Sequence, residues 1–214
     1  MLGSAGEFPD LNEQERLDFF RFYAEYVNGR VELLAGTGCI RYADTLALSN
    51  AVYELGYTPM VISPYYFEMD QEKPFVYYDR LAKDVKGDLY LYNFPPRTGH
   101  SIAPETIRRL IDVNPNIIGL KDSVSTPGHT NMVCRAVEGK PFTVYSGFDD
   151  QFLSNIANNG GGGCIGALSI IVPEIWSSLV KAANEKDFDR TFALYHLIQK
   201  LMPFYDMDTN CSVI

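Results

Sequence analysis

The feature that most constrains the fold is a regular alternation of short apolar runs with amphipathic stretches of helical period. Each apolar run has the length of a buried strand, and a stretch follows it in which apolar residues recur every three or four positions. The predicted strands are residues 31–35, 58–62, 89–92, 116–120, 142–145 and 164–168, and the predicted helices are residues 45–55, 70–85, 103–113, 127–137, 149–157, 173–184 and 188–201. Strands this apolar have no wet face, so they predict a parallel sheet that is buried on both sides.

Parallel strands joined by helices leave two main architectures, an open doubly wound sheet and a closed (β/α)8 barrel. Neither GxGxxG nor GxxxxGK[ST] follows the first predicted strand, which disfavours the nucleotide-binding form of the open sheet. A barrel needs eight strands and typically about 250 residues. The 214 residues of this chain supply six clear strands and a short strand-like stub at residues 1–3.

The chain is acidic, with 18 basic side chains against 27 acidic ones and a formal net charge of −9. Nucleic acid is therefore a poor candidate partner, because phosphate binding needs clustered Lys and Arg, and an anionic membrane surface repels such a chain. No apolar run approaches the length of a membrane span. We expect no metal site, because the three histidines are scattered, and we expect free thiols in a reducing cytoplasm, because no CxxC pair occurs among Cys39, Cys134, Cys164 and Cys211.

In a parallel barrel the functional side chains lie at the carboxyl ends of the strands. Lys121 directly follows the apolar run at residues 116–120. A lysine at the tip of an apolar strand loses hydration, which disfavours its ammonium form, and a neutral amine can attack a ketone to form an iminium. The structural alternative is a lysine that ends a strand and extends to water.

Other features at the same strand ends suit this chemistry. Tyr92 is placed for proton transfer, residues 3–6 (GSAG) offer backbone N–H groups to a carboxylate, and Arg97 can clamp a second carboxylate. The structural alternatives are an ordinary barrel aromatic, a plain turn and a surface arginine. Residues 158–163 (NNGGGG) lack the Lys and Ser or Thr of a phosphate loop, so we interpret them as a flexible turn that gives the substrate access.

With these motifs in this order, the chain resembles the dihydrodipicolinate synthase / N-acetylneuraminate lyase family of pyruvate-dependent class I aldolases. The likeness covers almost the whole chain. It rests on residues 3–8 (GSAGEF), 12–16 (NEQER), 35–38 (AGTG), 64–66 (PYY), 92–95 (YNFP), 119–122 (GLKD) and 146–147 (SG), and on the glycine-rich turn before Cys164. Each motif is weak alone, but their joint order and spacing are specific.

The resemblance implies a TIM (β/α)8 barrel of the α/β class and a set of catalytic roles. Lys121 is the implied Schiff-base lysine, so the covalent imine takes the place of a cofactor. Tyr92 is the implied proton-transfer residue, and Ser4 and Tyr66 complete a hydroxyl relay with it. In this family the equivalent of Tyr66 reaches into the site of a neighbouring subunit, which implies a homodimer or homotetramer.

The resemblance also implies a set of substrate-binding residues and two small-molecule partners, pyruvate and an aldehyde. The backbone of Ser4 and Ala5 holds the carboxylate of pyruvate, and Ile165 lines the pyruvate pocket. Gly147 belongs to residues 146–147 (SG), one of the motifs that match the family. Arg97 binds the carboxylate of the aldehyde partner in the synthase branch of the family.

Within the family, the sequence gives conflicting signals about the branch. Ala5 stands where the synthase branch usually has Thr, and Ile170 stands where many members have Asn. The YNFP form and residues 121–123 (KDS), with His129 seven residues after Asp122, are more like the branch that cleaves 2-oxo-3-deoxy sugar acids to pyruvate and an aldehyde. Arg97 is typical of 4-hydroxy-tetrahydrodipicolinate synthase, which joins pyruvate to aspartate semialdehyde. We predict the sugar-acid reaction and retain the synthase as the alternative.

The ends of the chain are the largest departure from the family pattern, because family members begin before the GSAGE motif and continue beyond residue 214. We therefore expect a truncated barrel at residues 1–185, without the first βα unit and the C-terminal helices, and the start of a C-terminal helical extension at residues 186–214. An open barrel exposes strand edges and apolar interior. A truncated, non-catalytic barrel is thus the alternative of another class, and an unrelated doubly wound binding module is the third.

Overall fold

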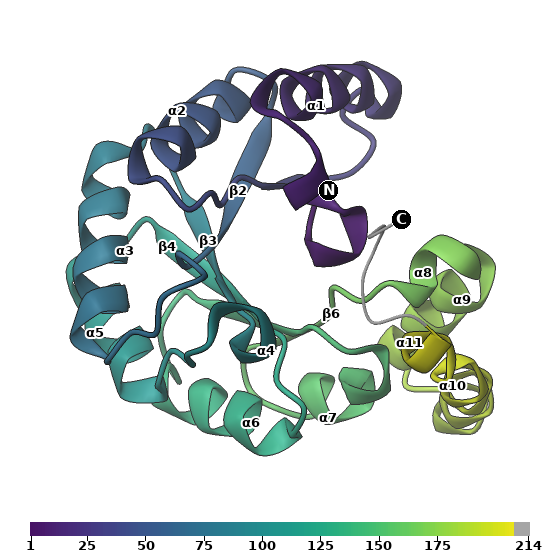
Figure 1. Ribbon diagram of the computed structural model, residues 1–214. Helices are drawn as coiled ribbons and strands as arrows, with labels where there is room; N and C mark the ends of the chain where they lie inside the picture. The colour runs from purple at the N-terminus through teal and green to yellow at the C-terminus, as the bar shows by residue number, and fades with distance from the viewer. Residues whose placement is uncertain (208–214) are drawn as a thin grey trace.

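The computed structural model describes residues 1–207, and at its centre is one sheet of six parallel strands with helices around its outer face (Figure 1). The strands pair in the order in which they occur in the chain. They are β1 (Leu33–Gly36), β2 (Tyr57–Ile62), β3 (Leu89–Asn93), β4 (Ile117–Asp122), β5 (Thr143–Ser146) and β6 (Gly161–Cys164). The predicted α/β class and parallel sheet are confirmed. Within the described residues β1 and β6 each pair on one side only, so the sheet is an open half-barrel.

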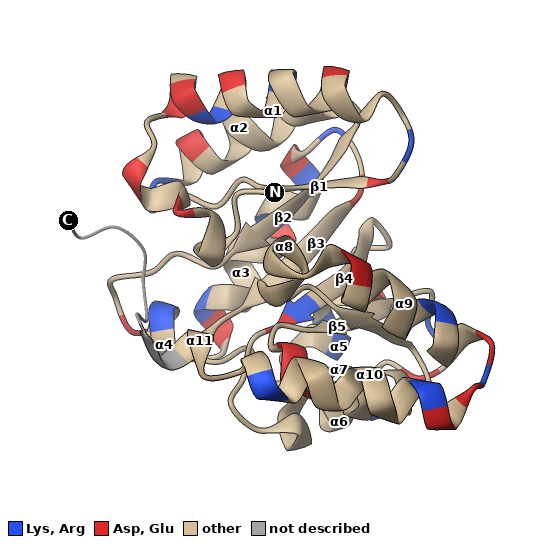
Figure 2. Ribbon diagram, turned by 90° about the vertical axis from the view of Figure 1, so that its right-hand side faces the viewer, with Lys and Arg blue, Asp and Glu red and all other residues tan. Residues whose placement is uncertain are grey.

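The connections between the strands are helical and cover the outside of the sheet. They include α2 (Tyr42–Tyr53), α3 (Glu72–Asp84), α5 (Pro104–Val113), α6 (Pro127–Ala136) and α7 (Phe152–Ile156). The short turns α4 (Pro95–Thr98) and η3 (Asp149–Gln151) lie instead where the chain leaves β3 and β5. Charged residues lie mainly on the helices and on the loops at their ends (Figure 2). This distribution leaves the faces of the sheet for apolar packing.

The register of neighbouring strands sorts the side chains of the sheet into two faces. Tyr92 on β3 pairs with Lys121 on β4, and Leu91 pairs with Leu120 one position earlier. Leu91 and Leu120 are fully buried in a cluster with side chains of α3, α5 and α6. Because side chains alternate across a strand, Tyr92 and Lys121 lie on the other face, inside the curve of the sheet.

The N-terminal segment lies inside the arc of helices, next to β1 (Figure 1). It forms the turns η1 (Ser4–Gly6) and η2 (Phe8–Asp10), and the helix α1 (Glu13–Val27) follows. Residues 1–3 do not form the predicted strand-like stub, although the Met1 amine donates to the Leu34 carbonyl and the Gly36 N–H donates to the Met1 carbonyl at 2.8 Å. A reciprocal pair of side-chain to backbone hydrogen bonds between Asn12 and Glu15 begins α1.

Two predictions near the end of the sheet are wrong. Residues 161–163 belong to strand β6 and not to a flexible turn, and the predicted strand at residues 164–168 has only its first residue in β6. A Cβ on Gly162 would lie 2.4 Å from Thr143 Cγ2 and 2.7 Å from the Tyr145 ring, so the glycines fit against the side chains of β5. Glycines carry no hydrophobic pattern, which is why the strand was missed.

The C-terminal part of the described chain is helical. It comprises α8 (Leu168–Ile171), α9 (Pro173–Asn184), α10 (Phe188–Leu201) and α11 (Phe204–Met207). A buried apolar cluster joins these helices to α7, and it includes Phe152, Trp176, Leu179 and Ile198. The described cysteines are free thiols, and the prediction for Cys211 lies outside the described residues. In residues 1–207 no helix combines the length and apolar character that crossing a membrane requires.

Replacement of Leu120 tests the core between the sheet and its helices. Leu120→Ala removes a fully buried side chain, and we expect a loss of about 3 kcal/mol in the free energy of unfolding, measured by chemical denaturation. Leu197→Ala is the control, because Leu197 on α10 is 41% exposed and should cost far less. Equal losses in the two variants would contradict the assigned core.

Candidate active site

Lys121 lies at the carboxyl end of β4, and its side chain is enclosed by the inside of the sheet and the N-terminal turn. The residue is 8% exposed, and its Nζ lies 4.5 Å from the centroid of the Tyr92 ring. A Cβ on Gly3 would lie 3.6 Å from Lys121 Nζ and 3.9 Å from Met60 Cε, so the turn covers the amine. The structural alternative of a lysine that extends into bulk water does not fit this burial.

Tyr92 is the neighbour of Lys121 on β3 and connects it to the N-terminal turn. The Tyr92 hydroxyl lies 3.1 Å from Ser4 Oγ, and either oxygen can donate the hydrogen bond. Tyr92 is 2% exposed, and its ring stacks on Phe94 with centroids 5.9 Å apart. The structure therefore brings together three of the four predicted catalytic residues, Lys121, Tyr92 and Ser4.

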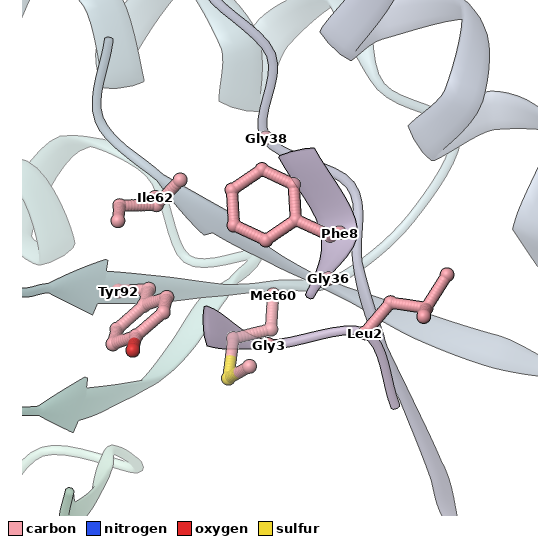
Figure 3. A pocket seen from close by; sticks show the side chains of 8 residues that line it. All are labelled: Leu2, Gly3, Phe8, Gly36, Gly38, Met60, Ile62 and Tyr92. Atoms are coloured by element: carbon pink, nitrogen blue, oxygen red, sulfur yellow. The ribbon is translucent and has the colours of Figure 1, made fainter. Parts of the chain in front are cut away.

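A small pocket with a largely apolar lining adjoins this group, between the N-terminal turn and the first three strands (Figure 3). Its lining residues are Leu2, Gly3, Phe8, Gly36, Gly38, Met60, Ile62 and Tyr92. Gly3 and Tyr92 line this pocket and also lie beside the Lys121 amine. The amine thus has largely apolar surroundings on one side, where electrostatic interactions are stronger than in water.

Asp122 points to the opposite face from Lys121 and is the centre of a buried polar network. Its Oδ1 accepts a hydrogen bond from Asn93 Nδ2 at 2.7 Å, and its Oδ2 accepts from Thr130 Oγ1 at 2.7 Å. His129 Nδ1 lies 2.9 Å from the same Oδ2, and His129 Nε2 lies 3.1 Å from the Ile102 carbonyl. Asn93 and Asp122 directly follow Tyr92 and Lys121, so the network fixes the strand ends that carry the two inward side chains.

His129 faces a hydrogen-bond acceptor at each ring nitrogen, an arrangement that the protonated ring satisfies with two N–H donors. Burial of the ring opposes protonation. The hydrogen bond and negative charge of Asp122 outweigh burial, so the pKa of His129 is raised above its usual value. The pair therefore favours an imidazolium beside the Asp122 carboxylate.

Arg97 lies in α4, on the loop that follows β3. It is exposed, and its guanidinium lies 5.7 Å from the centroid of Phe94, the ring that stacks on Tyr92. His100 anchors this loop, because its Nε2 lies 2.8 Å from Ser63 Oγ and its Nδ1 lies 2.9 Å from the Thr98 carbonyl. Arg97 is thus positioned at the mouth of the half-barrel.

The other predicted site residues fall into two groups. Ala5 lies within η1, and Ile165 and Gly147 directly follow β6 and β5, at the end of the sheet where Lys121 lies. Among the described residues Ala5 N–H makes no hydrogen bond, Ile165 N–H donates to the Ser146 carbonyl at 2.9 Å, and Gly147 N–H donates to the Asp122 carbonyl at 2.9 Å. Tyr66 is separate from them. It is 83% exposed, its φ is 93°, and its ring packs edge-on against Phe67.

Sequence reasoning missed the network around Asp122 and the buried carboxylate of Asp149. The signal for the first was an acidic residue that follows Lys121 in an apolar strand and a histidine on the next helix. Asp149 had no signal, because its partners lie far along the chain. In residues 1–207 no three His, Cys, Asp or Glu side chains are grouped so that they could hold a metal ion.

Comparison with known proteins gives a consistent result. The model of the dihydrodipicolinate synthetase family matches residues 1–214. The putative 2-dehydro-3-deoxy-D-gluconate aldolase YagE of Escherichia coli K12 is 33% identical over 211 residues, which are 97% of this chain and 70% of that protein. A 4-hydroxy-tetrahydrodipicolinate synthase of Kosmotoga olearia is 33% identical over 213 residues, which are 98% of this chain and 72% of that protein.

Solved structures show the same similarity in three dimensions. The crystal structure of YagE from E. coli K12 in complex with pyruvate superposes with a TM-score of 0.92 and 32% identity, covering 98% of this chain and 71% of that one. A dihydrodipicolinate synthase from Aquifex aeolicus superposes with a TM-score of 0.90 and 27% identity, covering 97% of this chain and 71% of that one. This chain thus spans about 70% of the length of the proteins that it resembles.

The raised pKa of His129 predicts how its contribution to stability depends on pH. A group whose pKa is raised by folding stabilises the fold fully below its unfolded pKa, about 6.5 for histidine, and loses that effect as pH rises through the folded pKa. We therefore expect the difference in unfolding free energy between wild type and His129→Gln to be largest in mild acid and to shrink as pH rises. Chemical denaturation at several pH values measures it.

His196→Gln is the matched control, because His196 is exposed on α10. Its difference from wild type should not follow this pH profile. A difference for His129→Gln that grows as pH rises would contradict a protonated His129 beside Asp122.

Proposed function

The chain belongs to the dihydrodipicolinate synthetase family, and from that premise we propose that it is a class I aldolase that cleaves or forms a 2-oxo-3-deoxy acid, with pyruvate and an aldehyde as the other reaction partners. The observation that carries the proposal is the placement of the Lys121 amine 4.5 Å from the centroid of the Tyr92 ring, whose hydroxyl lies 3.1 Å from Ser4 Oγ. A buried amine beside a hydroxyl pair has the two groups that Schiff-base formation needs, a nucleophile and a proton donor.

The first chemical stage is imine formation on Lys121. The neutral amine adds to the C2 carbonyl carbon of pyruvate, and the resulting carbinolamine loses its hydroxyl group as water. Tyr92 supplies the proton that this hydroxyl needs in order to leave, and Ser4 is the next hydroxyl in the relay. When a C3 proton is then removed, the electron pair of the C3–H bond forms the C2–C3 double bond and the π pair of the iminium moves to nitrogen, which gives an enamine.

The second stage is the making or breaking of a carbon–carbon bond. The enamine C3 attacks the aldehyde carbon, the aldehyde oxygen takes up a proton, and water hydrolyses the iminium to release the 2-oxo acid and restore the amine. Cleavage runs through the same steps in reverse. These reaction steps need no cofactor, because the protonated imine itself accepts the electrons of the carbon–carbon bond that breaks.

The residues around the amine supply substrate binding. In the proposed site the backbone N–H groups of Ser4 and Ala5 at the start of η1 hold the pyruvate carboxylate, and Ile165 forms the wall beyond β6. Gly147 lies on the rim between β5 and that wall. The six strands correspond in this proposal to six of the eight strands of a (β/α)8 barrel.

Tyr66 enters the proposal through a second copy of the chain. It is 83% exposed and makes no hydrogen bond with Tyr92 among the described residues, so within one chain it does not complete the relay. Its exposure beside Phe67, 68% exposed, suits insertion into the site of a neighbouring subunit. We therefore propose a homodimer or homotetramer.

The aldehyde partner is assigned to the sugar-acid class on sequence features. Ala5 lacks the side-chain hydroxyl of the synthase branch, Ile170 replaces the Asn of many members, and residues 92–95 (YNFP) and 121–123 (KDS) resemble the sugar-acid branch. The second candidate is 4-hydroxy-tetrahydrodipicolinate synthase, which the position of Arg97 at the mouth favours, because a guanidinium binds a carboxylate with two parallel hydrogen bonds.

Borohydride reduction in the presence of pyruvate tests the Schiff base. The wild-type chain should gain the mass of one reduced pyruvyl group, and peptide mapping should place it on Lys121. Lys121→Arg should abolish the adduct, because a guanidinium does not form the imine. Lys140→Arg is the control and should retain the adduct, since Lys140 pairs with Asp112 on the outside of the sheet. A wild-type chain that gives no adduct would support the non-catalytic alternative.

Arg97→Ala separates the two candidate reactions. We expect pyruvate release from 2-oxo-3-deoxy sugar acids to change little, whereas any condensation with aspartate semialdehyde should fall about 10- to 100-fold through loss of a charged hydrogen-bond pair. Coupled assays of both reactions measure the effects. Arg80→Ala is the control, because Arg80 also lies over an aromatic ring, Tyr42, but on the outer helices. Turnover of the semialdehyde without cleavage of any sugar acid would overturn the branch assignment.

A further inference from the structure

Asp149 is a fully buried carboxylate that the proposed reaction does not use. It lies in η3, just beyond β5. Its Oδ2 accepts hydrogen bonds from Ala167 N–H at 3.0 Å and Leu168 N–H at 3.4 Å, and also from the Tyr205 hydroxyl. Its Oδ1 has no partner in the part of the chain that the structure describes. The hydrogen-bond donors that stabilise the buried Asp149 carboxylate therefore come from the segment after β6 and from α11.

The segment that Asp149 holds is the one that begins with Ile165. Ile165 N–H is fixed to the Ser146 carbonyl at 2.9 Å, and Ala167 N–H is fixed to Asp149. Gly166 lies between these two anchors, and a Cβ there would be 2.2 Å from Asp149 Oδ2. The carboxylate thus holds residues 167 and 168 by hydrogen bonds and leaves no room for a side chain at residue 166.

Tyr205 makes a second connection to the site through its ring. The ring lies edge-on to Phe148 with centroids 6.0 Å apart, and Phe148 lies edge-on to Phe94 at 6.3 Å. Phe94 in turn stacks on Tyr92 at 5.9 Å. A continuous series of aromatic rings therefore runs from α11 to the proposed proton-transfer residue, while the Tyr205 hydroxyl contacts the segment that carries Ile165. Tyr205 therefore contacts residue 167 through its hydroxyl and Phe148 through its ring.

The hydroxyl of Tyr205 is suited to a permanent donor role. Burial and the adjacent Asp149 carboxylate raise the pKa of Tyr205, so the phenol keeps its proton. Ala167 N–H lies 3.0 Å from the Tyr205 oxygen as well as 3.0 Å from Asp149 Oδ2. The Tyr205 phenol thus donates a hydrogen bond to the Asp149 carboxylate, and the Ala167 N–H donates to both of these oxygens.

We propose that Tyr205 and Asp149 are positioning residues that hold Ile165 as the wall of the pyruvate pocket, so that the C-terminal helical segment takes part in substrate binding. This inference rests on the proposed function. Neither residue touches the reacting atoms. Their effect is on how tightly the pocket fits pyruvate, and they act through the path of residues 165–168.

Titration of borohydride trapping with pyruvate tests the inference. Tyr205→Phe keeps the ring and removes the hydroxyl, and we expect the pyruvate concentration for half-maximal labelling to rise about tenfold, as loss of a hydrogen bond to a charged group allows. The maximal labelled fraction should stay at the wild-type level. Tyr195→Phe is the matched control, because the Tyr195 hydroxyl donates to the Asp150 carbonyl and, among the described residues, makes no hydrogen bond to residues 165–168. Its titration should match wild type.

A Tyr205→Phe protein with the wild-type half-saturating pyruvate concentration overturns the inference. This holds whether its labelled fraction is unchanged or falls, and a fall alone is what a purely structural role predicts. A wild-type chain without any adduct overturns the proposed function and this inference with it. An adduct in wild type with no shift in Tyr205→Phe overturns only the inference.

Gly166→Ala is a second, independent variant. It forces a methyl group against the Asp149 carboxylate and displaces the same segment while Tyr205 stays intact. We expect a rise in half-saturating pyruvate of the same order as in Tyr205→Phe. A Gly166→Ala protein that binds pyruvate as wild type does overturns the proposal, even if Tyr205→Phe fails to fold.

Discussion

The parallel register that sets Tyr92 opposite Lys121 is the constraint on which the rest of the structure depends. Because side chains alternate across a strand, this one register assigns Tyr92 and Lys121 to the inside of the sheet and Asn93 and Asp122 to the outside. A slip by one residue would bury the lysine among the helices. The apolar pairing of Leu91 with Leu120, both fully buried, opposes such a slip.

The same register explains why a buried charge is tolerated so close to the proposed site. Asp122 is fully buried, and an isolated carboxylate there would be strongly unfavourable. Three side-chain donors from β3 and α6 meet it at 2.7 to 2.9 Å, so its charge is compensated. These bonds join the ends of two strands to α6, and His129 Nε2, which lies 3.1 Å from the Ile102 carbonyl, extends the network to the loop before α5. The polar contacts of Asn93 and Asp122 thereby fix the backbone that carries the inward side chains of Tyr92 and Lys121.

The sequence allowed the sheet and most helices to be predicted, because their apolar residues follow a strand or helix period. It failed at β6, since Gly161 to Gly163 have no side chains to show a period. Lys121, Tyr92 and Ser4 were predicted to lie together from motif order, and they do. The Asp149 to Tyr205 contact spans 56 positions in the sequence and involves no repeated pattern, so only the folded chain reveals it. Tyr66 has a left-handed backbone, with a φ of 93°, which composition likewise does not indicate.

The order of the strands in the sheet has a consequence for how the molecule is assembled. Each strand pairs with the one that precedes it in the chain, so β1 to β6 can join the sheet one after another as the polypeptide lengthens. The pairing of Tyr92 with Lys121 is complete when β4 docks on β3. The bond from Tyr205 to Asp149 waits for α11, near the end of the described chain. The amine that we propose as the nucleophile and the proposed wall of the pyruvate pocket are therefore completed at different times, and a nascent chain carries the first before the second is fixed.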